Sequence, residues 1–231
     1  LDDLRLGAWY RLGLIERHAT RYEQLVAASG DPWFAALAGH RRGSALRARG
    51  EPDAAVAALR ATLDAAVAAR LGYRAELIEL ELAQLYLELD RLPDAAEVAA
   101  TAWARARAGG EAGHVAAALP VLGAVALHRF QLALARAYFE EWLAIQPGDC
   151  AIEPHGATHL AEIALLERDP VQARGRLAQA RRCPAVATSA QLTLAQLAID
   201  VALWRGGGTA AQADVLNAEL ATLEAQPEAV S

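Results

Sequence analysis

The feature that most limits the fold of this chain is a helix start that recurs along it. Pro52–Ala55 and Pro93–Ala96 both read Pro-Asp-Ala-Ala, and Pro170–Ala173 keeps the Pro and the last Ala. Pro is well accepted in the first turn of a helix, because its missing N–H would have no partner there. Each match therefore predicts the beginning of a helix.

The last alanine of the match defines a long period. These anchor alanines are Ala55, Ala96, Ala135, Ala173 and Ala211, which lie 41, 39, 38 and 38 residues apart. An apolar or small residue follows each anchor four positions later, as Phe139 follows Ala135. A helix that packs against a neighbour shows this spacing on its buried face. The period predicts the second helices of five successive helix pairs.

In three of the five pairs the first helix carries a small residue at a fixed distance before the anchor, and Ile199 is the exception in the last pair. Gly43 and Gly123 lie twelve residues before Ala55 and Ala135, and Ala161 holds the same position in a later pair. Glycine inside a helix costs about 1 kcal/mol relative to alanine. The recurrence of glycine at this position indicates that the two helices of a pair approach each other closely.

These patterns predict an all-α chain of about eleven helices, and Val and Ile are too scattered to suggest strands. A single helical array is expected over 1–231, with an irregular helix or helix pair at 1–30 and a frayed tail at 226–231. The repeat units are expected at 36–69, 77–109, 116–147, 154–183 and 192–225. Gly30-Asp31-Pro32 is expected to begin a new helix, and Asp169 to cap another.

The unit at 116–147 resembles the tetratricopeptide repeat family. It carries Leu122-Gly123, Ala135, Phe139 and Pro147 at that family's spacing. The chain departs from the family in its period, which is longer than about 34 residues, and in Trp142, where a small residue is usual. The resemblance implies a right-handed superhelical solenoid of antiparallel helix pairs.

The long Ala- and Arg-rich units also look like the C-terminal sensor arrays of bacterial signal-transduction ATPases and LuxR-type transcriptional regulators. That likeness implies that the chain is part of a larger bacterial regulatory protein. In such a protein the array would hold the regulator inactive, or would bind an inducer or a partner.

Charge and hydropathy restrict the partners. The net charge is −6 and the pI about 5.5, whereas nucleic-acid-binding domains are usually basic, so direct contact with nucleic acid is not expected. The longest charge-free stretch, 112–128, contains Pro120 and is shorter than the ~20 apolar residues of a membrane span. With no leader pattern at the N-terminus, we expect a cytoplasmic protein. Cys150 and Cys183 are then expected to be free thiols.

The motifs of common enzyme chemistry are missing from the sequence. It contains no Lys, which excludes a phosphate-binding P-loop, and no Ser lies in a Gly-x-Ser-x-Gly elbow. We therefore expect no enzyme and no cofactor. One cluster, His155, His159 and Glu162, has the helical spacing of a zinc site. The competing interpretation, which we favour, is the opening turn of an ordinary helix.

The leading hypothesis is that the chain binds a protein or peptide segment, or a small-molecule effector, in the groove of the array. The resemblance implies that the first helix of each pair lines this groove. By register, His155, Thr158 and Glu162 would face it in one unit, and Arg47 and His128 in others. A free-standing scaffold is the alternative, and an enzyme or a metal-binding protein ranks third.

Overall fold

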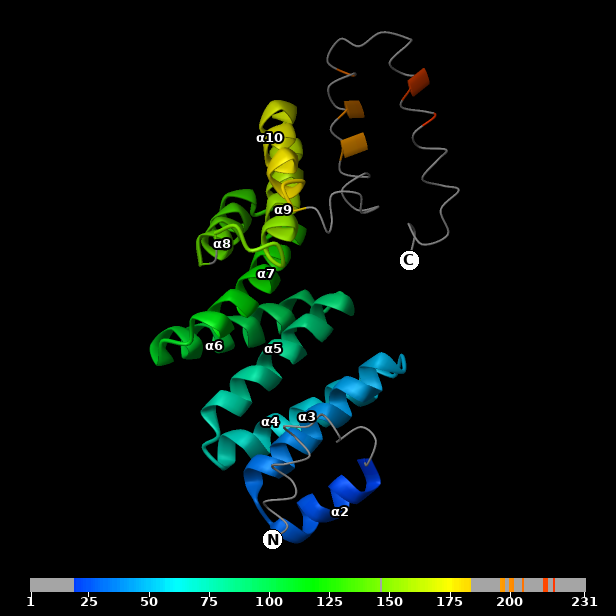
Figure 1. Ribbon diagram of the computed structural model, residues 1–231, viewed down its shortest axis with the longest axis vertical. Helices are drawn as coiled ribbons and strands as arrows, with labels where there is room; N and C mark the ends of the chain where they lie inside the picture. The colour runs from blue at the N-terminus through cyan, green and yellow to red at the C-terminus, as the bar shows by residue number, and fades with distance from the viewer. Residues whose placement is uncertain are drawn as a thin grey trace. The chain divides into compact units, whose positions relative to one another are not determined.

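The computed structural model describes residues 19–145 and 147–183, with isolated positions 196, 197, 200, 201, 205, 214, 215 and 218. In these residues all regular structure is helical (Figure 1). The helices are α2 (Ala19–Ser29), α3 (Pro32–Ala48), α4 (Pro52–Ala68), α5 (Gly72–Glu88), α6 (Leu92–Gly109), α7 (Ala112–His128), α8 (Leu132–Ile145), α9 (Glu153–Leu166) and α10 (Pro170–Ala180). The described part thus holds nine helices and not the eleven or so expected. Residues 1–18 and most of the expected unit at 192–225, including Ala211, lie outside it.

The chain divides into two units, residues 1–121 and 122–231, and each is described by itself. In the first unit α3 packs against α4, α4 against α5, and α5 against α6, while α3 also contacts α5. In the second unit α8 packs against α9 and α9 against α10. Helices that contact their neighbours in chain order form a helical-repeat array. No helix among the described residues is long and apolar enough to cross a membrane.

Two helices begin with a carboxylate cap, which confirms the cap expected at Asp169 and adds one at Asp31. Asp31 accepts a hydrogen bond from the Trp33 amide at 2.8 Å, and α3 begins at Pro32. Asp169 accepts from the Gln172 amide at 2.9 Å at the start of α10. Each carboxylate satisfies an amide that the helix itself leaves unpaired.

A left-handed residue closes the first helix of every described pair. These residues are Gly50, Asp90, Phe130 and Arg168, with φ of 74°, 55°, 56° and 63°. Around Phe130, the Gln131 amide donates to the Ala126 carbonyl at 2.9 Å, the long bond of a Schellman motif. Only the first of the four turns has glycine, which adopts this conformation without steric cost. In the other three turns, an exposed residue other than glycine adopts this conformation.

The same position of each described second helix lies in the core. The fourth residue of each second helix, namely Ala55, Ala95, Ala135 and Ala173, is 0 % exposed. The residues four positions later, Leu59, Ala99, Phe139 and Leu177, are also buried. Ala96 is only half-buried, so the structure places the α6 register one residue earlier than the sequence interpretation. The sequence interpretation aligned Pro93 with Pro52 as the first residue of a helix. Because α6 begins at Leu92 and not at the proline, that alignment shifted the register by one residue.

Small residues of the first helices lie against this core. A Cβ added to Gly43 would lie 2.5 Å from the Leu59 side chain, and one added to Gly123 would lie 2.7 Å from the Phe139 ring. These distances are shorter than any normal contact, so glycine is what allows the helices their approach. Ala83 and Ala161, both buried, lie sixteen residues before Ala99 and Leu177, which is the spacing of the two glycine contacts.

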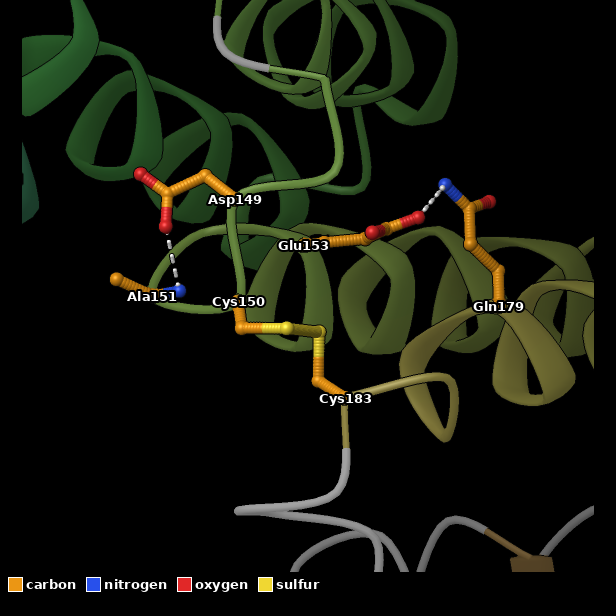
Figure 2. Close-up of a disulfide and its surroundings, with 6 residues drawn as sticks. All are labelled: Asp149, Cys150, Ala151, Glu153, Gln179 and Cys183. Carbon is orange, nitrogen blue, oxygen red and sulfur yellow. Dashed lines mark hydrogen bonds between the residues drawn. A yellow bond between two sulfur atoms is a disulfide. The ribbon is translucent and has the colours of Figure 1, made fainter.

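The expectation of two free thiols is wrong. Cys150 and Cys183 form a disulfide, with their Cα atoms 5.4 Å apart (Figure 2). Cys150 lies in the turn before α9 and Cys183 directly after α10. Two antiparallel helices bring the start of the first beside the end of the second, so cysteines that flank such a pair meet. Between the helices, Gln179 donates to Glu153 at 3.1 Å close to the same end (Figure 2).

Candidate functional site

A groove of about 920 Å³ opens in the first unit between α2, α3 and α5. Its lining follows α3 and its C-cap from Leu37 to Arg49. The lining combines apolar walls with charged side chains: Tyr22, Glu23, Leu37, Ala38, His40, Arg41, Arg42, Ser44, Ala45, Ala48, Arg49, Arg74 and Glu81. A concave surface with a few convergent polar groups is the usual setting of a binding site.

A row of hydrogen bonds and ion pairs joins α3 to α5 beside the groove, and its His40, Ser44 and Glu81 are part of the lining. Glu81 of α5 lies 2.5 Å from His40 Nε2 and accepts a hydrogen bond from Ser44 Oγ at 2.8 Å. Seven residues later on α5, Glu88 accepts from Arg47 Nε at 3.0 Å. His40, Ser44 and Arg47 are spaced by four and three residues and so share one face of α3. The first helices of two successive pairs are therefore joined by charge-assisted bonds.

The environment of Glu81 keeps it ionised. Burial raises the pKa of this carboxyl, but hydrogen bonds from His40 and Ser44 and the charges of His40 and Arg47 lower it by more. The pKa of Glu81 therefore lies below its ordinary value. At neutral pH the carboxylate is charged, and it is already bonded to His40 and Ser44.

The rest of the groove is rich in arginine. Arg74 of α5 is 5 % exposed, and its guanidinium lies 4.4 Å from the centre of the Trp33 ring. Arg41, half-buried, and Arg42, exposed, lie on α3, and Arg49 follows its last residue. Stacking on an aromatic face restricts a guanidinium and lets its N–H groups serve other acceptors. The arginines of the lining thus range from the buried, stacked Arg74 to the exposed Arg42.

Two further carboxylates of α5 are buried away from the groove. Glu76 lies 2.6 Å from His114 Nδ1, and Glu79 accepts from Arg105 at 3.1 Å. Burial raises the pKa of Glu79, Arg105 lowers it and the neighbouring Glu76 raises it, and the result is a pKa above the ordinary value. One oxygen of Glu79 is buried without a hydrogen-bond partner. Because Glu76, Glu79, Glu81 and Glu88 all bond to other helices, α5 is the polar centre of the first unit.

The residues singled out from the sequence do not gather in one site. Arg47 lies on α3 beside the groove, where Glu88 engages it. In the second unit, His128 is exposed in the last turn of α7 and His155 is exposed on α9. Thr158 Oγ1 donates to the Pro154 carbonyl of its own helix at 2.7 Å. Glu162 is exposed, 3.6 Å from His159 Nδ1.

The zinc interpretation of α9 finds no geometric support. The His159 ring stacks on Phe139 with their centres 4.5 Å apart, which gives this histidine a packing role. Among the described residues, no three His, Cys, Asp or Glu side chains come together in a metal-binding group. His155, His159 and Glu162 therefore do not form one.

Sequence reasoning missed most of the groove, although signals were present. His40, Ser44 and Arg47 follow helical spacing, and Glu81 and Glu88 are seven residues apart on the next first helix. Matching these two rows would have predicted the row of bonds between α3 and α5. Arg74 and Trp33 carried no such signal, because their contact depends on how α3 and α5 pack.

Comparison with known proteins shows the fold alone. No family model matches this chain, and no curated protein matches it. Among solved structures, a repeat protein of Podospora anserina, described as a kinesin light chain with nearly identical TPR-like repeats, is 18 % identical with a TM-score of 0.59, covering 82 % of this chain and 95 % of its own. PilF of Pseudomonas aeruginosa is 18 % identical with a TM-score of 0.64, covering 94 % and 99 %. The apo form of RapI is 12 % identical with a TM-score of 0.67, covering 94 % of this chain and 63 % of its own.

Proposed function

Because the chain folds as a tetratricopeptide-like helical array, we propose that it is a binding module that holds a segment of another protein in the α2–α3–α5 groove. The observation that carries this proposal is the groove itself. Its lining runs for twelve residue steps along α3 and its C-cap, from Leu37 to Arg49, or about 18 Å at 1.5 Å per residue. That length accommodates five or six residues of an extended peptide at about 3.3 Å each.

A peptide suits this groove better than a small-molecule effector does. Small-molecule pockets enclose most of their ligand. Here, arginines, glutamates, a histidine and a serine line an open trough beside alanines and leucine. Such a surface offers hydrogen bonds along its whole length, as a peptide backbone and its side chains require.

The side chains in the groove do not favour an enzyme. Ser44 Oγ and His40 Nε2 both contact Oε2 of Glu81. Since the serine hydroxyl donates to the carboxylate and not to the histidine, the two do not form a nucleophile and its base. The bonds instead hold α3 against α5 and shape the wall of the groove.

Selection from a random peptide library tests the proposal. The full chain is immobilised, and the selected peptides are measured by fluorescence anisotropy against two variants. Ala45→Trp fills the groove from an exposed position of its lining, and Ala104→Trp places the same side chain at an exposed position of α6. We expect Ala45→Trp to weaken binding at least tenfold and Ala104→Trp to leave it unchanged. Failure to select any peptide, or equal binding by both variants, would contradict the proposal.

The finer assignment as the sensor array of a regulator is supported by the Ala- and Arg-rich units. A free-standing scaffold would use the same groove, so the binding test does not separate the two. The reading frame around the gene segment does. An ATPase or helix-turn-helix module in the same frame supports the sensor array, and stop and start codons directly at both ends support the scaffold.

A further inference from the structure

The packing of α9 differs on its two sides. Towards α8, Leu160 and Ile163 are buried with Phe139, and Trp142 and Leu143 pack against the same cluster. Towards α10, the buried residues are almost all alanine: Ala157, Ala161, Ala164, Ala173, Leu177 and Ala180. Alanine buries much less apolar area than Leu, Ile or Phe. Apolar packing therefore holds α10 on α9 less firmly than it holds α9 on α8.

The polar links of α10 add little to this packing. Arg176 donates to Glu140 of α8 at 2.9 Å, and this pair is exposed. Gln179 donates to Glu153 of α9 at 3.1 Å in a partly buried bond near the disulfide (Figure 2). Exposed ion pairs and single hydrogen bonds each contribute little to stability. The disulfide, which closes a loop with a sequence separation of 33, is expected to contribute more than either bond.

The two cysteines of the disulfide differ in exposure. Cys150 is exposed, whereas Cys183 is 1 % exposed. Thiol–disulfide exchange begins when a thiolate attacks one of the two sulfurs, and its rate depends on access to that sulfur. We therefore expect a thiolate from solution to attack Cys150 Sγ, with Cys183 as the leaving thiolate.

No other sulfur in the sequence competes with this pair for an oxidant. The sequence contains no Met, and its two Cys are those of the disulfide. Oxidants of moderate strength act on the thiols and thioethers of a protein. Within this sequence, sulfur oxidation is thus confined to one end of the α9–α10 pair.

From the alanine packing and the exposed Cys150, we propose that the α9–α10 pair is a redox switch. In the oxidised state the disulfide holds α10 on α9. On reduction α10 separates from α9 and uncovers Ala157, Ala161 and Ala164, while α9 stays packed on α8. The switch belongs to the second unit and does not depend on the binding function proposed for the groove of the first.

A switch suits this bond better than a permanent crosslink does. Exposed disulfides are more easily reduced than buried structural ones. Because the alanine contact is weak, the two helices can open locally after reduction and separate the thiols, which favours the reduced state. In a compartment that keeps thiols reduced, disulfides are usually transient and belong to catalytic or redox-sensing proteins.

Reduction by glutathione takes two exchanges. One glutathione thiolate attacks Cys150 Sγ and forms a mixed disulfide, while the bond to Cys183 breaks and its electron pair leaves on Cys183, which takes a proton from water. A second glutathione thiolate attacks the glutathione sulfur of the mixed disulfide, and Cys150 leaves as a thiolate and is protonated. Two glutathione molecules thus supply two electrons and depart as glutathione disulfide, and the reverse exchanges restore the bond.

The test follows the full chain in mixtures of reduced and oxidised glutathione, from equal amounts to about a hundredfold excess of the reduced form. Alkylation with mass spectrometry measures the reduced fraction, and hydrogen–deuterium exchange measures opening in the same samples. We expect one reversible transition within this range, reached from either starting state. Exchange in α10 should be at least tenfold faster in the reduced chain and unchanged in α8, α3 and α5.

A double variant separates loss of the bond from other effects of the thiol reagent. Cys150→Ser with Cys183→Ala should show the fast α10 exchange of the reduced wild type in every mixture. Slow α10 exchange in the reduced wild type would overturn the proposal, and so would acceleration in α3 and α5, which would mean unfolding of the whole chain. A disulfide that survives the largest excess of reduced glutathione would instead make the bond a permanent part of the fold, as in an oxidising compartment, and would equally refute the switch.

Discussion

The α3–α5 contact and the α9–α10 pair solve the same packing problem with different chemistry. Between α3 and α5, Glu81 and Glu88 bond to side chains of the facing helix. The core of α9 and α10 is almost entirely alanine, with Ala157, Ala161, Ala164, Ala173, Leu177 and Ala180 buried together, and a disulfide closes one end. Alanine faces offer little area to bury, so a covalent bond supplements them. Only the charged contact leaves polar groups beside an open groove.

Both units of the chain repeat the buried alanine at the fourth position of their second helices, and replacing it should have the largest effect. Ala95→Asp and Ala135→Asp would each place an unpaired charge at a fully buried position, at a cost of about 3–5 kcal/mol or more. We expect both variants to lose the cooperative melt in circular dichroism. Ala96→Asp, at the half-buried neighbour, should lower the melting temperature by only a few degrees. If Ala96→Asp were as damaging as Ala95→Asp, the register described for α6 would be wrong.

The disulfide should matter only in the alanine-rich pair. It closes a loop with a sequence separation of 33, for which chain entropy predicts about 3–4 kcal/mol of stabilisation. Replacing Cys150 and Cys183 by Ser and Ala should lower the free energy of unfolding in urea by this order. Hydrogen exchange in the variant should accelerate in α9 and α10 and stay unchanged in α3 and α5. Unfolding that is identical with and without a thiol reductant would show that the bond contributes nothing.

The contribution of the charged α3–α5 contact to stability should depend on pH. Glu81 has a lowered pKa, so its ionised form stabilises the fold above the unfolded-state pKa, and this contribution is lost as pH falls through the folded value. Glu81→Gln should cost about 1–3 kcal/mol at pH 7, and the difference from the wild type should narrow below about pH 4. Urea unfolding of the variant and the wild type at several pH values measures this difference in stability.

Glu79 provides the matched variant with the opposite sign. Its pKa is raised, so the protonated form suits the fold and its favourable contribution is lost as pH rises through the folded value. The stability of Glu79→Gln relative to the wild type should therefore rise with pH where that of Glu81→Gln falls. Parallel pH profiles for the two variants would contradict the electrostatic account of α5.

The smallest expected effect concerns the turns. Phe130 is 74 % exposed and has a φ of 56°, a left-handed conformation that costs a non-glycine residue about 1–2 kcal/mol. Phe130→Gly should relieve part of this cost. We expect it to raise the free energy of unfolding by about 1 kcal/mol and the melting temperature slightly. Gly50→Ala, at the equivalent turn of the first unit, should lower the free energy of unfolding by a similar amount. Destabilisation by Phe130→Gly would show that the ring makes a packing contribution.

The sequence predicted the helical repeat because the repeat is carried by local signals. Three such signals are proline at helix starts, the Asp169 cap, and the small residues of the first helices such as Gly43, and each depends on neighbours within a few turns. Such signals also fixed the fold class without any aligned relatives. The one-residue error at Ala96 arose where the proline occupies the second position of its helix instead of the first.

The candidate site was less predictable because it depends on contacts between distant helices. Glu81 meets Ser44 across 37 residues, and Arg74 stacks on Trp33 only after α3 and α5 have packed. The disulfide was missed for another reason. Two cysteines were judged by their number and by the assumed compartment, whereas their positions at the two ends of one antiparallel pair held the relevant information.

Hydrogen–deuterium exchange of the full chain with and without a peptide selected from the library tests the central claim most directly. The account predicts slower exchange along α2, α3 and α5, which line the groove, and no change in α9 and α10. Protection confined to α9 and α10, or no protection under conditions where anisotropy shows the peptide to be bound, would contradict it.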